Sequence, residues 1–113
     1  MSAPSTWREF LERRGVSLGA FGPDERALGR EDALRAVDLV ESEGDTILGG
    51  DVYVADGGRT VSALANWYSE RRGDESIQSF ASRSCAESRS YIMEDPDPPR
   101  GQALFVLVVA ERA

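Results

Sequence analysis

The chain contains 113 residues, of which 41% are hydrophobic and 29% are charged, and its net charge is −7. This size and balance predict one folded domain over residues 1–113 with a real hydrophobic core. The negative charge opposes contact with phosphate backbones, so nucleic acid is not expected as a partner. The longest apolar run, Ala103 to Ala110, is far shorter than the roughly 20 residues that cross a membrane, so a membrane is not expected either.

The chain has no histidine and a single cysteine, Cys85. Without histidine, the commonest general base near neutral pH is missing. A lone cysteine forms no internal disulfide, which fits a reducing compartment. Charged residues also occur between Met1 and Arg14, where a signal peptide would be apolar. We therefore expect a cytoplasmic protein that uses no cofactor and no metal.

Two helices are expected first. Trp7, Phe10 and Leu11 have helical spacing within Pro4 to Arg14, and Gly15 is a candidate left-handed cap at the end of that helix. A loop follows from Val16 to Leu28. The second helix is expected from Arg30 to Ser42, and its apolar face would consist of Ala33, Val37 and Val40, broadened by Leu34 and Ala36.

A β-hairpin is expected next. Thr46 to Val54 and Thr60 to Tyr68 flank Ala55-Asp56-Gly57-Gly58, a sequence that favours a tight turn because glycine tolerates positive φ. Period-two alternation then sorts the first strand into two faces. One face would carry Leu48, Val52 and Val54, and the opposite face Asp51 and Tyr53.

Glycines and aromatic residues mark the ends of this hairpin. Gly49 and Gly50 within an apolar strand indicate a bulge or a close backbone approach. Trp67 is expected to belong mainly to the core, whereas Tyr68, on the same face as Asn66, is expected to be exposed.

A third helix is expected from Glu75 to Met93, with Asp74 as its N-cap. Its inward stripe would consist of Ile77, Phe80, Ala81, Ser84, Ser88, Tyr91 and Ile92. A proline-rich segment follows from Asp95 to Gly101. The apolar run from Leu104 to Val109 then predicts a strand that is apolar on both faces and therefore central in its sheet. The order ααββαβ predicts an α+β fold with a small, mostly antiparallel sheet of about three strands and three helices. A homodimer could cover a sheet face left partly bare.

Charged residues suggest both internal and external contacts. Glu75 lies at the start of the third helix, where free backbone N–H groups favour a carboxylate. Arg83, two helical turns later, could pair with Glu75 or Asp51 and hold the hairpin against the helix. An internal ion pair is favoured over an anion site. The segment from Ala36 to Gly58 contains acids and no base, so it would either attract a basic partner or only favour solubility: Asp38, Glu41, Glu43, Asp45, Asp51 and Asp56.

Several of these motifs occur together in one known family. They are Leu28-Gly29-Arg30-Glu31-Asp32-Ala33-Leu34, Ile47-Leu48-Gly49-Gly50-Asp51-Val52-Tyr53, Asn66-Trp67-Tyr68, Glu75-Ser76, Arg83-Ser84, Tyr91-Ile92 and Leu104-Phe105-Val106-Leu107-Val108. From about Trp7 to Val109 the chain resembles the immunity protein 40 family, small bacterial proteins assigned to polymorphic toxin systems. Members of this family tend to have serine or threonine where this chain has Gly29.

The resemblance implies an intracellular antidote that binds a cognate toxin domain and blocks it. An acidic surface would speed capture of a basic toxin domain. The residues expected to contact the toxin or to steer it are Asp51, Tyr53, Tyr68, Glu75, Asp45 and Asp56. The residues expected to preserve the fold are Gly49, Gly50, Asn66, Trp67, Arg83 and Ser84. Toxin specificity could instead lie in a variable loop such as Val16 to Arg26.

Two other readings remain open. In a small carboxylate-based hydrolase, Asp51, Glu75 and Tyr53 would converge as acid, base and hydrogen-bond donor. Alternatively, the chain could be a homo-oligomeric structural or regulatory module, with Trp7 or the apolar C-terminal strand at its interface.

Overall fold

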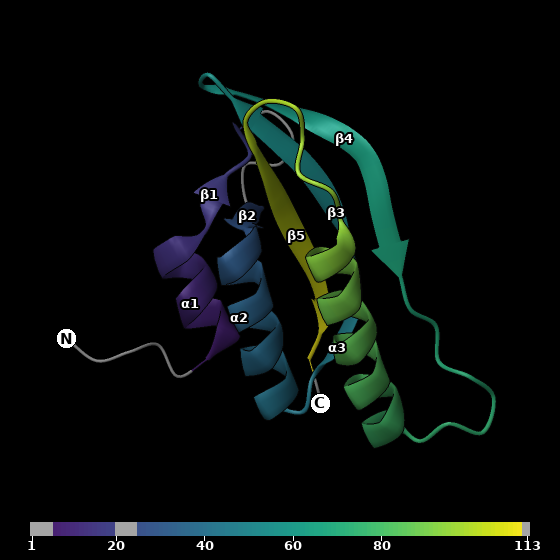
Figure 1. Cartoon of the computed structure of the whole chain (residues 1–113). Coiled ribbons are helices and arrows are strands. Elements are labelled where there is room, and N and C mark those ends of the chain that lie inside the picture. The colour runs from purple at the N-terminus through teal and green to yellow at the C-terminus, as the bar shows by residue number, and fades with distance from the viewer. Residues whose placement is uncertain (1–5, 20–24, 112–113) are drawn as a thin grey trace.

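The computed structural model describes residues 6–19 and 25–111. Three helices and five strands follow one another along this part of the chain (Figure 1). Their bounds are α1 Trp7–Arg14, β1 Val16–Ser17, β2 Arg26–Gly29, α2 Arg30–Ser42, β3 Thr46–Asp56, β4 Arg59–Tyr68, α3 Ile77–Glu94 and β5 Gln102–Ala110. The predicted α+β class is confirmed.

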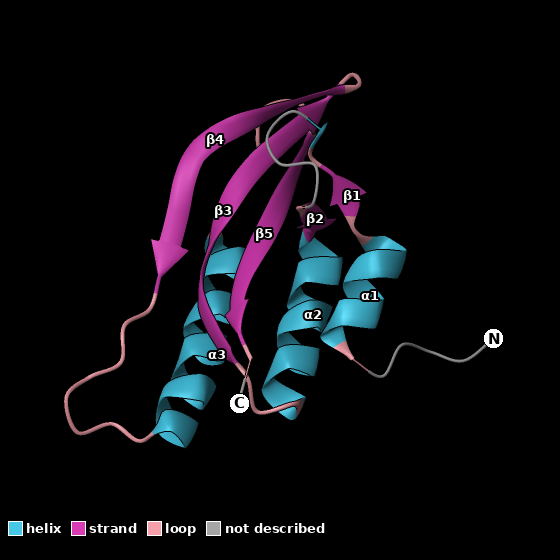
Figure 2. Cartoon of the chain, turned by 180° about the vertical axis from the view of Figure 1, so that it is seen from behind, coloured by secondary structure: helices cyan, strands magenta, loops and turns pink. Residues whose placement is uncertain are grey.

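The strands form one antiparallel sheet in the order β1-β2-β5-β3-β4. All three helices pack against the same face of this sheet, as the two opposite views show (Figures 1 and 2). The other face, which we call the outer face, is turned toward the viewer in Figure 2. The predicted central position of the C-terminal strand is confirmed, because β5 lies between β2 and β3.

The main core lies between the helices and the sheet. Its largest fully buried side chains include Phe105, Leu28, Ile47, Ile92 and Val37. A smaller cluster covers part of the outer face, and it contains Leu18, Ala27, Leu104 and Val106, with Tyr53 and Ala55 packed against it. The outer face is left open farther along β5, where Val108 is 43% exposed.

The sheet has two more strands than the sequence suggested. The expectation of a loop from Val16 to Leu28 is wrong at both ends, since β1 and β2 pair there as antiparallel neighbours. These strands contain two and four residues, which is too short for a period-two pattern to be recognised. The middle of that loop, like the predicted helix start at Pro4, lies outside the described residues.

Two predicted helix caps are also wrong. Gly15 is extended at φ −71° rather than left-handed, and glycine fits there because a Cβ would collide with the Leu11 carbonyl and with Arg26. Ser76, not Asp74, is the N-cap of α3, because its hydroxyl accepts a hydrogen bond from the backbone N–H of Ser79 at 3.0 Å.

The inward stripe of α3 is confirmed except at Ile77, which is 58% exposed in the first turn. Within that stripe, Ser84 is fully buried and accepts a hydrogen bond from the backbone N–H of Ile47 at 3.0 Å. Its hydroxyl also donates to the carbonyl of Ala81. This serine therefore joins the helix to the first residues of β3. In α2, Gly29 is the N-cap and makes no side-chain capping bond.

The alternation predicted for the first strand of the hairpin is wrong at Leu48. The register of β3 against β5 shifts between Ile47 and Gly49, so Ile47 is buried and Leu48 is 40% exposed. This irregularity is the bulge that the two glycines predicted. At Gly50 a Cβ would collide with the Trp67 ring, which explains the need for glycine.

Candidate partner-binding face

A shallow hollow of about 220 Å³ lies on the outer face, where β3 begins and β4 ends. Two sequence motifs meet there, because Asp51 is opposite Asn66 and Gly49 is opposite Tyr68 in the β3–β4 ladder. We call this site the outer hollow, and its lining consists of Leu48, Gly49, Gly50, Asp51, Asn66, Trp67, Tyr68 and Val108.

Trp67 supports the outer hollow from the helix side of the sheet. Its ring stacks on Tyr91 with centroids 4.6 Å apart and meets Phe105 edge-on at 6.5 Å. Its indole N–H donates to the hydroxyl of the fully buried Ser88 at 3.0 Å. These contacts fix the ring in place, and they agree with the predicted core role.

The rim of the outer hollow is largely apolar and accessible. Tyr68 is 75% exposed, as the sequence predicted, and Val108 and Leu48 are 43% and 40% exposed. Asp51 adds one carboxylate to this surface. An aromatic anchor beside aliphatic groups and a charge is a composition typical of protein–protein contacts.

Tyr53 also belongs to the outer face but is half-buried. Its ring packs against the cluster of Leu104 and Val106. Burial, followed by the negative charge of Asp51, raises the pKa of the Tyr53 phenol. Tyr53 therefore stays neutral near pH 7. It supports the sheet by packing, and it follows Asp51 on the same face of β3.

Glu75 lies elsewhere, in an ion-pair cluster with Arg83. Arg83 donates from Nε and Nη2 to the two carboxylate oxygens of Glu75, each at 2.7 Å. Arg83 also donates to Glu87 Oε1 at 3.0 Å and to the Glu70 carbonyl at 2.7 Å. Of the two pairings predicted for Arg83, the one with Glu75 is confirmed and the one with Asp51 is wrong.

The ion pair with Arg83, and not the N-terminus of α3, determines the protonation state of Glu75. The hydrogen bonds from Arg83, and then the one from the backbone N–H of Arg72, lower the pKa of the Glu75 carboxyl to about 2. The expected role at the helix N-terminus is wrong, because the carboxylate turns to Arg83 instead. The cluster ties the chain between Ser69 and Glu75 to α3, since Ser69 also donates to Glu87 at 2.7 Å.

The lowered pKa predicts a pH dependence of stability. Glu75 is deprotonated in the fold down to about pH 2, whereas its ordinary pKa is 4.5. The stabilisation from this pair is therefore fully present above pH 4.5 and is lost as the pH falls toward 2. We expect Glu75→Gln to unfold more easily than the wild type at pH 7, with the difference shrinking between pH 4.5 and 2. Urea titrations across that range measure the difference in unfolding free energy between variant and wild type, with Glu94→Gln as an exposed control on α3. A difference that stays constant with pH would contradict the prediction.

The structure does not bring the remaining predicted acids to the outer hollow. Asp45 precedes β3 and is only 8% exposed. Asp56 ends β3 at the exposed tip of the hairpin. Asp45 directly precedes the 11-residue strand β3 and Asp56 is its last residue, so the two side chains lie at opposite ends of this strand.

Other acids of the segment from Ala36 to Gly58 have contacts inside the protein. Arg89 on α3 donates to Asp38 at 2.9 Å and to Glu41 at 2.8 Å. Glu43 accepts a hydrogen bond from the backbone N–H of Trp7 at 3.0 Å. These acids join elements of the helix layer, so part of the negative charge of the segment is offset within the chain.

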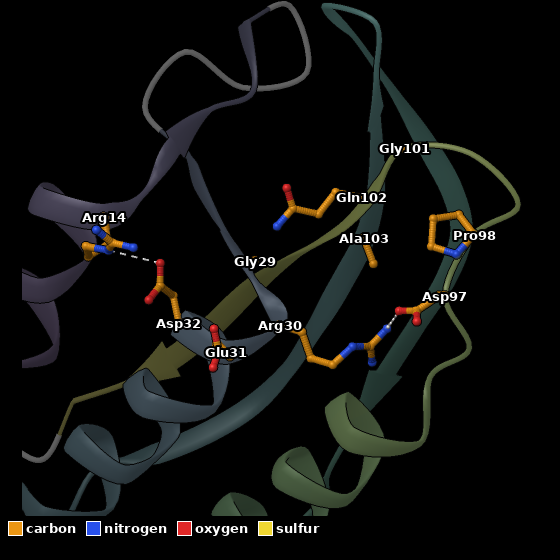
Figure 3. A pocket seen from close by; sticks show the side chains of 10 residues that line it. All are labelled: Arg14, Gly29, Arg30, Glu31, Asp32, Asp97, Pro98, Gly101, Gln102 and Ala103. Carbon is orange, nitrogen blue, oxygen red and sulfur yellow. Dashed lines mark hydrogen bonds and ion pairs between the residues drawn. The ribbon is translucent and has the colours of Figure 1, made fainter.

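A larger depression, of about 390 Å³, lies where α2 begins (Figure 3). Both of its arginines make contacts within the chain: Arg14 pairs with Asp32 at 3.0 Å and Arg30 with Asp97 at 2.8 Å. Arg30 also lies over the Phe105 ring, 5.4 Å from its centroid. Sequence reasoning placed Arg30 only at the start of a helix, and nothing in the local pattern signalled this long-range role.

The residues of the hydrolase hypothesis do not converge. Asp51 belongs to the outer hollow, while both oxygens of Glu75 are bound to Arg83. A lowered pKa at Glu75 is the opposite of what a general acid requires. Burial raises the pKa of the Cys85 thiol to about 11, so it is protonated near pH 7. Among residues 6–19 and 25–111, no group of three or more Cys, Asp or Glu side chains could hold a metal ion.

These features describe a small α+β module whose sheet is covered by helices on one face and left partly open on the other. None of the helices in the described part of the chain is long and apolar enough to span a bilayer. The family model for Immunity protein 40 matches residues 17–109. The chain belongs to this immunity protein family, which confirms the resemblance. Searches of curated proteins and of solved structures gave no match.

Proposed function

We propose that this chain is a cytoplasmic antidote that binds a cognate toxin domain through the outer hollow and blocks it. Family membership supports the antidote role. The observation that carries the choice of surface is the exposed rim of Tyr68, Leu48 and Val108 around Asp51, on the sheet face that the helices leave open. The chain acts by occupying the toxin and needs no cofactor or chemistry of its own.

The charge of the chain supports a basic toxin domain as the partner. A net charge of −7 accelerates the encounter with a positive surface and makes the rate depend on salt. Asp51 supplies the local charge within the outer hollow, and Asp56 adds to the long-range field from the hairpin tip.

Co-expression tests this function directly. Bacteria would carry the toxin domain encoded beside the gene for this chain under one inducible promoter, and this chain under another. We expect growth to stop with the toxin alone and to be restored by the chain, while an unrelated acidic protein of similar size restores nothing. Equal growth arrest with and without the chain would contradict the proposal.

The open outer face also supports a second candidate, a homodimer that covers it. Two copies would bring net charges of −7 together, which opposes this arrangement unless salt screens it. Sedimentation at increasing protein concentration separates the two cases, because only self-association raises the mass of the isolated chain.

A further inference from the structure

The edge strand β4 contains an irregularity in its pairing with β3. Val52 of β3 is opposite Ala65, but the next residue, Tyr53, is opposite Ser62. Two residues of β4, Ala63 and Leu64, are therefore extra and have no partner in β3. A bulge of this kind bends a strand, and β4 is strongly bent (Figure 2).

Leu64 is an unusual residue for this position. Its φ is +56°, and it is the one residue other than glycine with positive φ in the part of the chain that the structure describes. Side chains with a Cβ are strained there, whereas glycine and asparagine are tolerated. The hydroxyl of Ser62 accepts a hydrogen bond from the backbone N–H of Leu64 at 3.1 Å and helps to hold this conformation.

The side chain of Leu64 also gains nothing from the fold, because it is 94% exposed. Neither the backbone conformation nor the packing of the isolated chain explains why this residue is a leucine. Strained residues of this kind concentrate at functional sites. An apolar side chain held outward by a fixed backbone loses little freedom when a partner binds it.

Exposed apolar side chains are concentrated on the three strands β3, β4 and β5. Of eight large apolar or aromatic side chains exposed in the described residues, five belong to β3, β4 and β5. They are Leu48, Leu64, Tyr68 and Val108, together with Val61, which is paired with Val54 and therefore lies on the helix-facing side of the sheet. Three of these belong to β4, which pairs only with β3 among the described strands. Leu64 precedes Asn66 and Tyr68 of the outer hollow along the same strand.

We infer that Leu64 is an anchor residue for the toxin domain, inserting into an apolar pocket of the toxin whose rim carries basic groups that face Asp51. This inference rests on the proposed function and adds the residue and the chemistry of the contact. Charge selects this occupant over a second copy, because the outer hollow has a carboxylate and no basic residue in its lining and the chain carries −7 overall.

Two substitutions separate binding from folding at this position. Leu64→Asn and Leu64→Gly both remove the apolar side chain while suiting a positive φ. We expect both variants to melt at the wild-type temperature or above it. We expect their affinity for the purified, inactivated toxin domain encoded beside this gene to be at least about tenfold lower in calorimetric titrations. Met93→Gln, at a 64%-exposed position on α3, is the matched control and should bind like the wild type.

The possible failures are distinguishable. If the wild type binds this toxin domain and Leu64→Asn binds it equally well, the anchor is wrong and the antidote function stands. If the wild type does not bind, the proposed function fails and the anchor with it. A clear drop in melting temperature for both variants would show that Leu64 supports the fold. A wild-type dimer that Leu64→Asn converts to monomer would assign Leu64 to a second copy of the chain.

Discussion

Asp51→Asn combined with Tyr68→Ala will weaken binding of the toxin domain by about 100-fold, which corresponds to about 2.7 kcal/mol. Tyr68 is the most exposed aromatic side chain of the outer hollow, and a tyrosine at the centre of an interface often contributes about 2 kcal/mol or more. In the proposed complex, Asp51 would supply the charge opposite a base of the toxin. Because neither side chain belongs to the main core, the melting temperature should change little.

Asp56→Asn is the matched control, since it removes one negative charge at the hairpin tip without touching the outer hollow. Surface plasmon resonance should show a modestly slower association for this variant and an unchanged dissociation rate. The double variant should dissociate faster. If the toxin dissociates from the double variant at the same rate as from the wild type, the toxin binds another surface.

Gly50→Ala will destabilise the fold by about 3 kcal/mol, at the upper end for overpacking in a well-packed site. The added Cβ would collide with the Trp67 ring and with the Val106 carbonyl. Neither group can move freely, because Trp67 stacks on Tyr91 and Val106 is paired with Asp51 in the central ladder. Loss of this packing would also deform the outer hollow.

Urea unfolding measures this effect, with Gly73→Ala as the control, because a Cβ at Gly73 meets no atom within 4 Å. The control should stay within about 0.5 kcal/mol of the wild type. A Gly50→Ala variant as stable as the control would mean that β3 and β4 are not packed as closely as described.

The elements with strong local signals could be predicted from the sequence. The bounds of α2 agree with the structure because Arg30 to Ser42 has a clear apolar stripe. The position of β5 followed from a strand that is apolar on both faces. The short strands β1 and β2 could not be predicted, because they are formed by pairing with each other and with β5 rather than by a pattern of their own.

The candidate site was predicted in part for a similar reason. Strand alternation placed Asp51 with Tyr53 on one face of the first strand and Asn66 with Tyr68 on one face of the second, and the observed ladder brings Asp51 opposite Asn66. Leu48 was assigned to the wrong face, since the exact position of a bulge depends on the pairing of β3 with β5. The conformation of Leu64 left no signal in the sequence at all, because leucine is an unfavourable choice for a positive φ.

The most direct test of the central claim is amide hydrogen exchange of the chain with and without its toxin domain. The account predicts slower exchange in β4 and in the first half of β3 when the toxin is bound, with α1 and α2 unchanged. Protection confined to the helix layer, with β4 exchanging as in the free chain, would contradict the outer face as the binding surface.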